Sequence, residues 1–448
     1  MKGVSRVLVA NRGEVAVRII RACRVLGIET VLAVSEADKD SVGARLADRS
    51  VIIGPPNVST YLNIPIIIKT ALETGAQAVH PGYGFLSEKP EFAKACEESG
   101  IVFIGPKAEH INKMGNKLAA RVLAGQCGVP VLPGSERVRT YEDVKGVVGS
   151  IGYPIIIKAS SGGGGRGMKI VSEEDGNALG RIFEEATAEA AAAFGDGTLY
   201  VEKYIANARH IEVQILGDKH GHVVHLGERD CSTQRRHQKL IEEAGAPGLT
   251  EDLRSGIHDA AVKLAKNISY ENAGTVEFVF DRDTGKFYFL EMNTRLQVEH
   301  PVTEMVTGVD IVREQINIAN GFELPFRQEE IKFRGHSIEC RINAENPDLN
   351  FMPTPGTITR WEIPQGPGVR VDTHCHQGYK VPIFYDSLLA KIIVCGDDRE
   401  HARRRMVCAL GEYLAEGVST TAPFLKKVLQ TPEFAEGRVS TRILDMDI

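Results

Sequence analysis

The stretch Lys158-Ala-Ser-Ser-Gly-Gly-Gly-Gly-Arg-Gly-Met168 contains five glycines in eleven residues, and it follows Tyr153-Pro-Ile-Ile-Ile157, an apolar run typical of a short buried strand. Glycine has no Cβ, so its backbone adopts positive φ and its N–H groups can lie directly against an anion such as phosphate. Lys158 at the strand end and Arg166 inside the loop add positive charge and hydrogen-bond donors. A flexible surface linker is the alternative, but the strand and the two basic residues favour an anion-binding loop.

This loop differs from the familiar nucleotide-binding motifs. The P-loop ends in Gly-Lys-Ser/Thr, whereas here Gly167 is followed by Met168 and Lys169. Near the N-terminus, Asn11-Arg-Gly-Glu14 lacks the G-x-G-x-x-G pattern of dinucleotide-binding folds. A nucleotide bound by this chain would therefore require a different architecture.

The composition excludes several classes of protein. Of the 448 residues, 43% are hydrophobic and 25% are charged, which is ordinary for a globular protein, and the net charge of −6 argues against nucleic-acid binding. No apolar run reaches the roughly 20 residues of a membrane span, and the chain begins with a strand pattern, not a signal peptide. The eight cysteines form no Cys-x-x-Cys pair, so we expect reduced thiols and a cytoplasmic protein. His374-Cys-His376 alternates across a strand, which disfavours a zinc site.

The first part of the chain, residues 1–113, alternates strand and helix signals. Strand patterns at 7–10, 30–34, 78–80 and 102–104, with helical spacing at 15–26, predict βαβ units and a parallel sheet, so the fold class is α/β. The stretch Asn11-Arg-Gly-Glu14 then lies at the carboxyl end of a strand, where such sheets bind ligands.

The rest of the chain mixes helices with antiparallel strands. We expect a helical segment at 111–125 that carries Lys117, a smaller region at about 130–205, and helices near 184–194 and at 253–266. Residues 275–280 and 286–291 alternate in strand fashion around the turn Asp281-Arg-Asp-Thr-Gly285, which predicts a hairpin. The last hundred residues are mixed α/β.

The predicted hairpin carries candidate metal ligands. Glu277 lies on its first strand and Glu291 near the end of its second, and Asn293 shares the face of Glu291 by strand alternation. Two carboxylates and an amide oxygen suit a hard cation such as Mg²⁺. The alternative is a pair of solvated glutamates, which the surrounding Phe and Leu residues disfavour because buried carboxylates need a partner.

Two polar stretches are candidates for the remaining chemistry. Arg295, Gln297 and Glu299 alternate, so an extended chain would present them on one face, with arginine binding an oxyanion and glutamate acting as a general base. The stretch 228–239 is dense in basic and polar side chains, and its charge alone favours a solvated surface loop.

Taken together, these motifs resemble those of the biotin carboxylase family of the ATP-grasp superfamily, from about residue 4 to 445. The stretches that carry the resemblance are the glycine loop, Ala10-Asn-Arg-Gly-Glu14, His80-Pro-Gly-Tyr-Gly-Phe-Leu-Ser-Glu88, Glu228-Arg-Asp-Cys-Ser-Thr-Gln-Arg-Arg-His-Gln-Lys239, Glu291-Met-Asn-Thr-Arg-Leu-Gln-Val-Glu-His-Pro-Val-Thr-Glu304, Glu339-Cys-Arg-Ile-Asn-Ala-Glu345 and Tyr385-Asp-Ser-Leu388. The resemblance implies a pre-ATP-grasp domain at 1–113, an ATP-grasp region of α+β character at 114–335 with a mobile lid at 131–204, and a C-terminal domain at 336–448. Ser161 replaces a glycine of many members, and the turn at 281–285 is about two residues longer than in some relatives; we expect neither to abolish function.

The resemblance also implies the site residues. It assigns ATP binding to Lys117, Lys158, Gly164, Gly165, Met168, Glu202, Lys203, Ile205, His210, Gln234, His237, Glu277 and Glu291, and the metal to Glu277, Glu291 and Asn293. It assigns bicarbonate to Lys239, Arg295, Gln297, Val298 and Glu299, biotin to Tyr83 and Arg341, and catalysis to Glu299, Arg341, Lys239 and Arg295.

The implied activity is ATP- and bicarbonate-dependent carboxylation of biotin through carboxyphosphate, with Mg²⁺ or Mn²⁺. No Ala-Met-Lys-Met biotinylation motif occurs before the chain stops near residue 448, so we expect biotin on a separate carrier protein, and carboxyltransferase chains as further partners. The resemblance implies a homodimeric subunit of acetyl-CoA carboxylase in fatty acid biosynthesis, or of another acyl-CoA, pyruvate or 2-oxoacid carboxylase. Two alternatives are a carboxylate–amine ligase working through an acylphosphate and a non-catalytic relative that keeps the fold.

Overall fold

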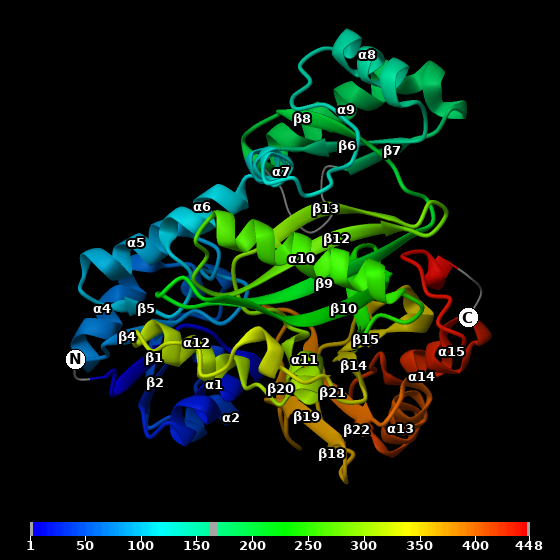
Figure 1. Ribbon diagram of the computed structural model, residues 1–448. Coiled ribbons are helices and arrows are strands. Elements are labelled where there is room, and N and C mark those ends of the chain that lie inside the picture. Colours follow the sequence, from blue (N-terminus) through cyan, green and yellow to red (C-terminus); the bar gives the residue numbers. More distant parts are fainter. Residues whose placement is uncertain (1–2, 161–167, 446–448) are drawn as a thin grey trace.

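The computed structural model describes residues 3–160 and 168–445, and it begins with a five-stranded parallel sheet in the order β3-β2-β1-β4-β5 (Figure 1). This confirms the predicted βαβ series. The strands are β1 (Arg6–Val9), β2 (Glu29–Ser35), β3 (Arg49–Gly54), β4 (Ala78–His80) and β5 (Val102–Phe103), joined by α1 (Gly13–Val25), α2 (Val42–Leu46), α3 (Val58–Tyr61), α4 (Ile64–Thr74) and α5 (Pro90–Glu98).

The strand order of this sheet reverses between β1 and β4, which is where open parallel sheets form a ligand crevice. The loops after these two strands are tied together there, because the Asn11 side chain donates to the carbonyl oxygens of Pro81 (2.6 Å) and Tyr83 (2.8 Å). Gly82 between them has φ +63°, and a Cβ at that position would meet the Asn11 amide at 2.9 Å. Glycine is therefore required for this close approach.

The connection to the next sheet differs from the single helical segment expected at 111–125. The structure has two helices, α6 (Ala108–Gly115) and α7 (Lys117–Gln126), separated at Asn116. Asn116 has extended backbone geometry (ψ 109°), and its side chain accepts from the backbone N–H of Ala119, as an N-cap residue does. The break makes Lys117 the first residue of α7.

A small unit, which we name the cap, stands above the rest of the molecule (Figure 1). It consists of α8 (Tyr141–Ile151), β6 (Ile155–Ala159), β7 (Met168–Val171), α9 (Leu179–Phe194) and β8 (Leu199–Lys203), with the antiparallel strand order β7-β6-β8. The predicted strand and the predicted alanine-rich helix are both confirmed. The cap has its own hydrophobic core, which includes Val144, Ile155, Ile157 and Leu199.

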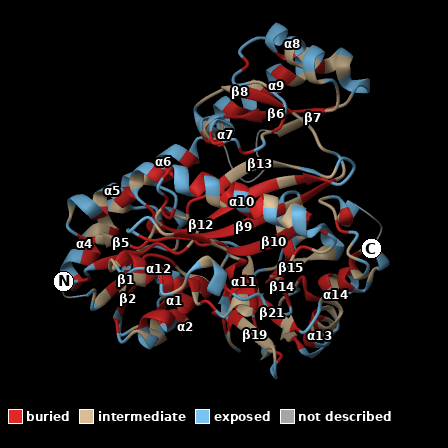
Figure 2. Ribbon diagram, in the orientation of Figure 1, coloured by how far each residue is buried: buried red, intermediate tan, exposed pale blue. Residues whose placement is uncertain are grey.

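The largest element is an eight-stranded antiparallel sheet in the order β13-β12-β9-β10-β11-β14-β21-β19. Its strands are β9 (Ala208–Gly217), β10 (Val223–Arg235), β11 (Gln238–Ala244), β12 (Asn272–Asp281), β13 (Lys286–Asn293), β14 (His336–Asn343), β19 (Val369–Thr373) and β21 (Leu388–Gly396). Helices α10 (Glu251–Asn267), α11 (His300–Thr307) and α12 (Ile311–Ala319) connect them. Buried residues concentrate along these strands (Figure 2).

The C-terminal part completes this sheet and adds peripheral elements. They are α13 (Arg399–Glu412), α14 (Ala422–Gln430), α15 (Pro432–Ala435) and three two-stranded ladders: β15 (Glu345–Asn346) with β16 (Met352–Pro353), β17 (Gly356–Thr357) with β20 (Lys380–Val381), and β18 (Arg360–Glu362) with β22 (Leu414–Glu416). All eight cysteines, each within the described residues, are free thiols. Across the described ranges no helix is long and apolar enough to cross a membrane.

Candidate active site

A cavity of about 730 Å³ lies between the large sheet, the cap and the carboxyl edge of the parallel sheet. Its size is in the range of small-molecule binding sites, about 300–1,000 Å³. Most of the residues predicted from the sequence line it: Tyr83, Lys117, Lys158, Met168, Lys203, Ile205, His210, Gln234, His237, Lys239, Glu277, Glu291, Asn293, Arg295, Gln297, Val298, Glu299 and Arg341. The fold thus brings together segments from all parts of the chain.

Three predicted residues stand apart from this set. Gly164 and Gly165 fall outside the described residues. Glu202 on β8 is buried beside the cavity without lining it, because its carboxylate accepts from Lys158 (2.6 Å) and lies 3.1 Å from Arg121. Its neighbours Lys203 and Ile205 do line the cavity.

Lys239 is at the centre of a buried cluster of carboxylates. Its Nζ lies 2.6 Å from Glu212, 3.1 Å from Glu277 and 2.6 Å from Glu299. Burial alone would lower the pKa of Lys239, but these carboxylates outweigh it and hold the pKa well above its ordinary value. The lysine is therefore a permanent cation, suited to bind and orient an anion and unsuited to act as a base.

Glu299 has a second cation beside it. This fully buried residue precedes α11, and its Oε2 accepts from Arg341 Nη2 at 2.9 Å while Oε1 accepts from Lys239. Arg341 in turn donates from Nε to Glu242 at 2.5 Å. A carboxylate fixed between two cations, at the wall of a cavity, has the position required of a general base.

The predicted hairpin is present, and a bulge between Glu277 and Phe278 sets the register of its polar residues. Glu277 on β12 lies opposite Glu291 on β13, and the Asn293 side-chain amide donates to Glu277 at 2.8 Å. Two carboxylates and an amide oxygen are hard donors of the kind that Mg²⁺ prefers, so the donor set fits this ion. Glu291 is ion-paired with Lys117 at 2.6 Å.

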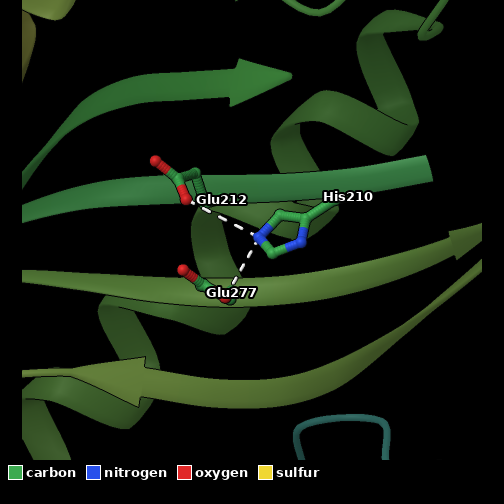
Figure 3. Close-up of side chains that lie close together, drawn as sticks. All are labelled: His210, Glu212 and Glu277. Atoms are coloured by element: carbon green, nitrogen blue, oxygen red, sulfur yellow. Dashed lines mark ion pairs between the residues drawn. The ribbon is translucent and has the colours of Figure 1, made fainter. Parts of the chain in front are cut away.

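A second group of side chains, His210, Glu212 and Glu277, is close enough to hold a metal ion but is better explained as an ion-pair cluster. His210 Nε2 lies 3.0 Å from Glu277 and 3.7 Å from Glu212, and Figure 3 shows its imidazole directed at both carboxylates. Burial would lower the pKa of His210, but the carboxylate of Glu277 outweighs it, and the pKa rises to about 9. A protonated imidazole has no lone pair for a metal, so His210 serves as a cation at neutral pH.

The segment that carries Arg295, Gln297 and Glu299 differs from the extended chain that we expected. It is an irregular connection between β13 and α11, yet all three side chains line the cavity. Arg295 donates from Nε to Glu88 at 2.8 Å and from Nη2 to Asn293 at 2.9 Å. The arginine is thus anchored on the side of the metal-ligand candidates.

The interpretation of 228–239 as a solvated loop is wrong. These residues form β10, a two-residue turn and β11, and Arg229 is completely buried. Its guanidinium donates to Glu212 (2.6 Å) and Gln214 (2.8 Å). Charge density in a sequence does not distinguish a solvated face from a buried network in which each charge has a partner.

Several residues at the site were not identified from the sequence. They are Glu88, Glu212, Glu242 and Lys391, which contact Arg295, Lys239, Arg341 and Val298 respectively. Glu88 ends a quoted motif, and Glu212 follows His210 at the spacing that shares one strand face, so both carried a signal. Glu242 and Lys391 depend on strand pairing that no local pattern reveals.

Three family models match the chain. They describe the biotin carboxylase N-terminal domain at residues 3–111, the ATP-binding domain of the carbamoyl-phosphate synthase L chain at 116–327, and the biotin carboxylase C-terminal domain at 339–446. The chain is 50% identical to biotin carboxylase 1 of Bacillus subtilis over 445 residues, which covers 99% of this chain and 98% of that protein. It is 52% identical to the biotin carboxylase of a Nostoc species, with coverage of 97% of each chain.

A solved structure shows the same fold. The biotin carboxylase domain dimer of the Hydrogenobacter thermophilus 2-oxoglutarate carboxylase, in complex with MgADP, ADP and bicarbonate, matches with a TM-score of 0.96 and 50% identity. The match covers 99% of this chain and 98% of that one.

Proposed function

The chain belongs to the biotin carboxylase family and is an ATP-dependent ligase that carboxylates biotin; we propose that it supplies the first half-reaction of a biotin-dependent carboxylase, with biotin on a separate carrier protein. The observation that carries this proposal is the placement of Glu299 between Lys239 and Arg341 at the cavity wall. A carboxylate–amine ligase would need the lysines and the carboxylate pair but not this base between two cations.

In the proposed reaction, Glu299 removes the proton of bicarbonate, and the resulting oxyanion attacks the γ-phosphorus of ATP. The P–O bond to ADP breaks, and carboxyphosphate forms. Lys239 and Arg295, whose charges face the cavity, would hold the bicarbonate in position. Lys117 and Lys158 would bind the phosphates, and each has a carboxylate partner to exchange for them.

Glu277, Glu291 and Asn293 would hold Mg²⁺. The ion, when bound, neutralises charge on the phosphate oxygens. What the chain itself contributes is orientation: Arg295 binds the Asn293 oxygen and Gln297 donates to Glu277 at 3.3 Å, so the metal-ligand candidates and the bicarbonate candidates form one hydrogen-bonded unit.

In the second step, carboxyphosphate releases CO₂ and phosphate, phosphate takes the ureido proton of biotin, and the biotin enolate attacks CO₂. Arg341 would stabilise the enolate oxygen, because its guanidinium lines the cavity and donates to the proposed base Glu299, which supports a place near both proposed substrates. We propose that the cap acts as a lid that excludes water from carboxyphosphate; its separate hydrophobic core supports movement as a unit.

The parent complex is proposed from the identities of the relatives. Those at 50–52% identity include biotin carboxylases, one chain of the pyruvate carboxylase of Methanothermobacter thermautotrophicus and the small chain of a 2-oxoglutarate carboxylase. We propose an acetyl-CoA carboxylase role in the cytoplasm, with the carrier and carboxyltransferase on other chains, and a homodimer like the Hydrogenobacter domain. Reconstitution with purified carriers from each type of complex would decide among them, since the productive carrier identifies the parent.

The first experiment is to measure ADP release by the purified chain with Mg²⁺ and bicarbonate, with and without free biotin. Bicarbonate-dependent release that biotin stimulates, together with carboxybiotin in the product, is the expected result. ADP release that needs neither compound, but needs an amine and another carboxylate, would instead support the ligase alternative.

A further inference from the structure

Lys391 is a fully buried lysine on the large sheet, one strand in from its β19 edge and outside the predicted site. It lies on β21, paired with Arg341 on β14 and with Asp372 on β19. Removing an ammonium group from water costs several kcal/mol unless its hydrogen bonds are replaced, and an apolar side chain of similar length would fill the same space. The contacts of its Nζ therefore indicate what the residue does.

The first contact is with the predicted bicarbonate segment. Lys391 Nζ donates to the backbone carbonyl of Val298 at 2.8 Å. Val298 lies between Gln297 and Glu299 in the irregular connection before α11, where no strand ladder holds the backbone. The lysine thus fixes the peptide that precedes the proposed base.

The second contact leads to the predicted biotin segment. Nζ lies 3.1 Å from Glu14 Oε1, and the same oxygen accepts a hydrogen bond from the hydroxyl of Tyr83. Glu14 is buried in the first turn of α1, and within the described residues its other oxygen has no hydrogen-bond partner. Tyr83 and Val298 are 215 positions apart in the sequence. The ammonium group of Lys391 binds Val298 directly and reaches Tyr83 through the carboxylate of Glu14.

Two further acidic neighbours, Glu339 and Asp372, do not explain the lysine. Neither oxygen of Glu339 has a hydrogen-bond partner within the described residues. Asp372 Oδ2 is 3.9 Å from Nζ, beyond hydrogen-bond distance. Arg370 already binds both oxygens of Asp372, at 2.9 and 2.7 Å. The direct hydrogen bond and the closest ion pair of Lys391 both point toward the cavity side.

We propose that Lys391 is a positioning residue that holds the Val298 segment at a fixed distance from the Glu14–Tyr83 pair, so that CO₂ formed beside Glu299 meets biotin held beside Tyr83. This inference rests on the proposed function, because it assigns the two ends of the link to bicarbonate and biotin. It extends that function by identifying a residue that couples the two half-sites without touching a substrate.

The test measures two quantities in Lys391→Met: KM for bicarbonate in ADP release without biotin, and carboxybiotin formed per ADP released with biotin. Loss of a charge-assisted hydrogen bond to the Val298 carbonyl should raise this KM about tenfold, and loss of the link to Glu14 should lower the product ratio severalfold. The control is Lys219→Met, because Lys219 is an exposed lysine that also donates to a backbone carbonyl, that of Ala319 at 2.8 Å, away from the cavity. It should leave both quantities unchanged.

A second variant separates the two ends of the link. Glu14→Gln retains an oxygen for the Tyr83 hydroxyl but loses the charge that faces Lys391, so the ratio should fall while KM for bicarbonate stays within twofold. A folded Lys391→Met variant with the wild-type KM for bicarbonate and the wild-type product ratio would overturn the proposal. A wild-type product ratio in Glu14→Gln would overturn it as well. If Lys391→Met does not fold, the result for Glu14→Gln decides alone. Absence of biotin-dependent turnover in the wild-type chain would instead refute the proposed function.

Discussion

Replacement of Glu299 by glutamine tests the proposed base with little change in volume. The side chain is fully buried, with Oε1 2.6 Å from Lys239 and Oε2 2.9 Å from Arg341. Glutamine removes the negative charge and the ability to take a proton, while its oxygen still accepts one hydrogen bond. A positioned general base contributes about 10²–10⁴-fold to a rate, so bicarbonate-dependent kcat should fall by that factor.

The effect on stability should be smaller than the burial of Glu299 suggests. Breaking a buried ion pair costs about 3–5 kcal/mol when the other charge is left without a partner. Here Lys239 retains Glu212 and Glu277, and Arg341 retains Glu242. We therefore expect a loss of about 1.5–3 kcal/mol in the free energy of unfolding, the value of a hydrogen bond to a charged group, with ATP binding retained.

The matched control is Glu339→Gln. Glu339 is also fully buried on the large sheet, directly opposite Glu242, and neither of its oxygens has a hydrogen-bond partner within the described ranges. Burial raises its pKa well above the ordinary value, and glutamine keeps the shape of the side chain. ADP release is measured by a coupled assay at saturating ATP, and nucleotide binding by calorimetry. Turnover of Glu299→Gln within threefold of wild type would refute the assignment of the base.

Three further predictions address other parts of the structure. Glu291→Gln should raise the Mg²⁺ concentration for half-maximal ADP release, and an unchanged metal titration would remove Glu291 from the metal site. Arg341→Lys keeps the charge but loses the planar fork that binds two carboxylates, so carboxybiotin formation should fall about 10²-fold while biotin-independent ADP release persists. Burial would raise the pKa of Glu243, but hydrogen bonds from His336 (2.8 Å) and Arg399 (2.7 Å) outweigh it and lower the pKa to about 2. A lowered carboxyl pKa stabilises the fold above pH 4.5, and this stabilisation is lost as the pH falls toward 2. Glu243→Gln should therefore lower the free energy of unfolding by about 3 kcal/mol at pH 7 and by progressively less below pH 4.5. Urea denaturation at several pH values would measure this.

The features that the sequence predicted well are those that follow from local periodicity. Alternation placed Asn293 on the face of Glu291, and the structure has the predicted hairpin; a bulge between Glu277 and Phe278, which alternation does not predict, brings Glu277 opposite Glu291. The βαβ pattern placed Asn11 at the carboxyl edge of a parallel sheet, where the strand order reverses. In both cases the side-chain direction repeats along the backbone, so a few residues suffice to define it.

The features that were missed depend on contacts between distant segments. Periodicity assigns Lys391 to one face of a strand, but β14, β19 and α1 determine that Val298 and Glu14 lie next to it. A single capping residue had a similar effect: helical spacing continues across Asn116, yet its side chain competes for a backbone N–H and ends the continuous helix. The polar stretch 228–239 was wrongly assigned to a solvated loop because the partners that stabilise its buried charges come from β9 and β12, which are distant in the sequence.

The two proposed phosphate-binding lysines share one feature that bears on how substrates enter. Lys117 is paired with Glu291 and Lys158 with Glu202, both at 2.6 Å. A phosphate that binds either lysine must replace the carboxylate already paired with it, so the net gain in electrostatic energy is small. Weakly binding anions therefore do not accumulate in the cavity. At Lys117 the displaced carboxylate is itself a metal-ligand candidate. A nucleotide that arrives with its metal supplies a partner for Lys117 and for Glu291 together, whereas a nucleotide or a metal alone leaves one of them unpaired. The ion pair therefore favours the metal–nucleotide complex over either component.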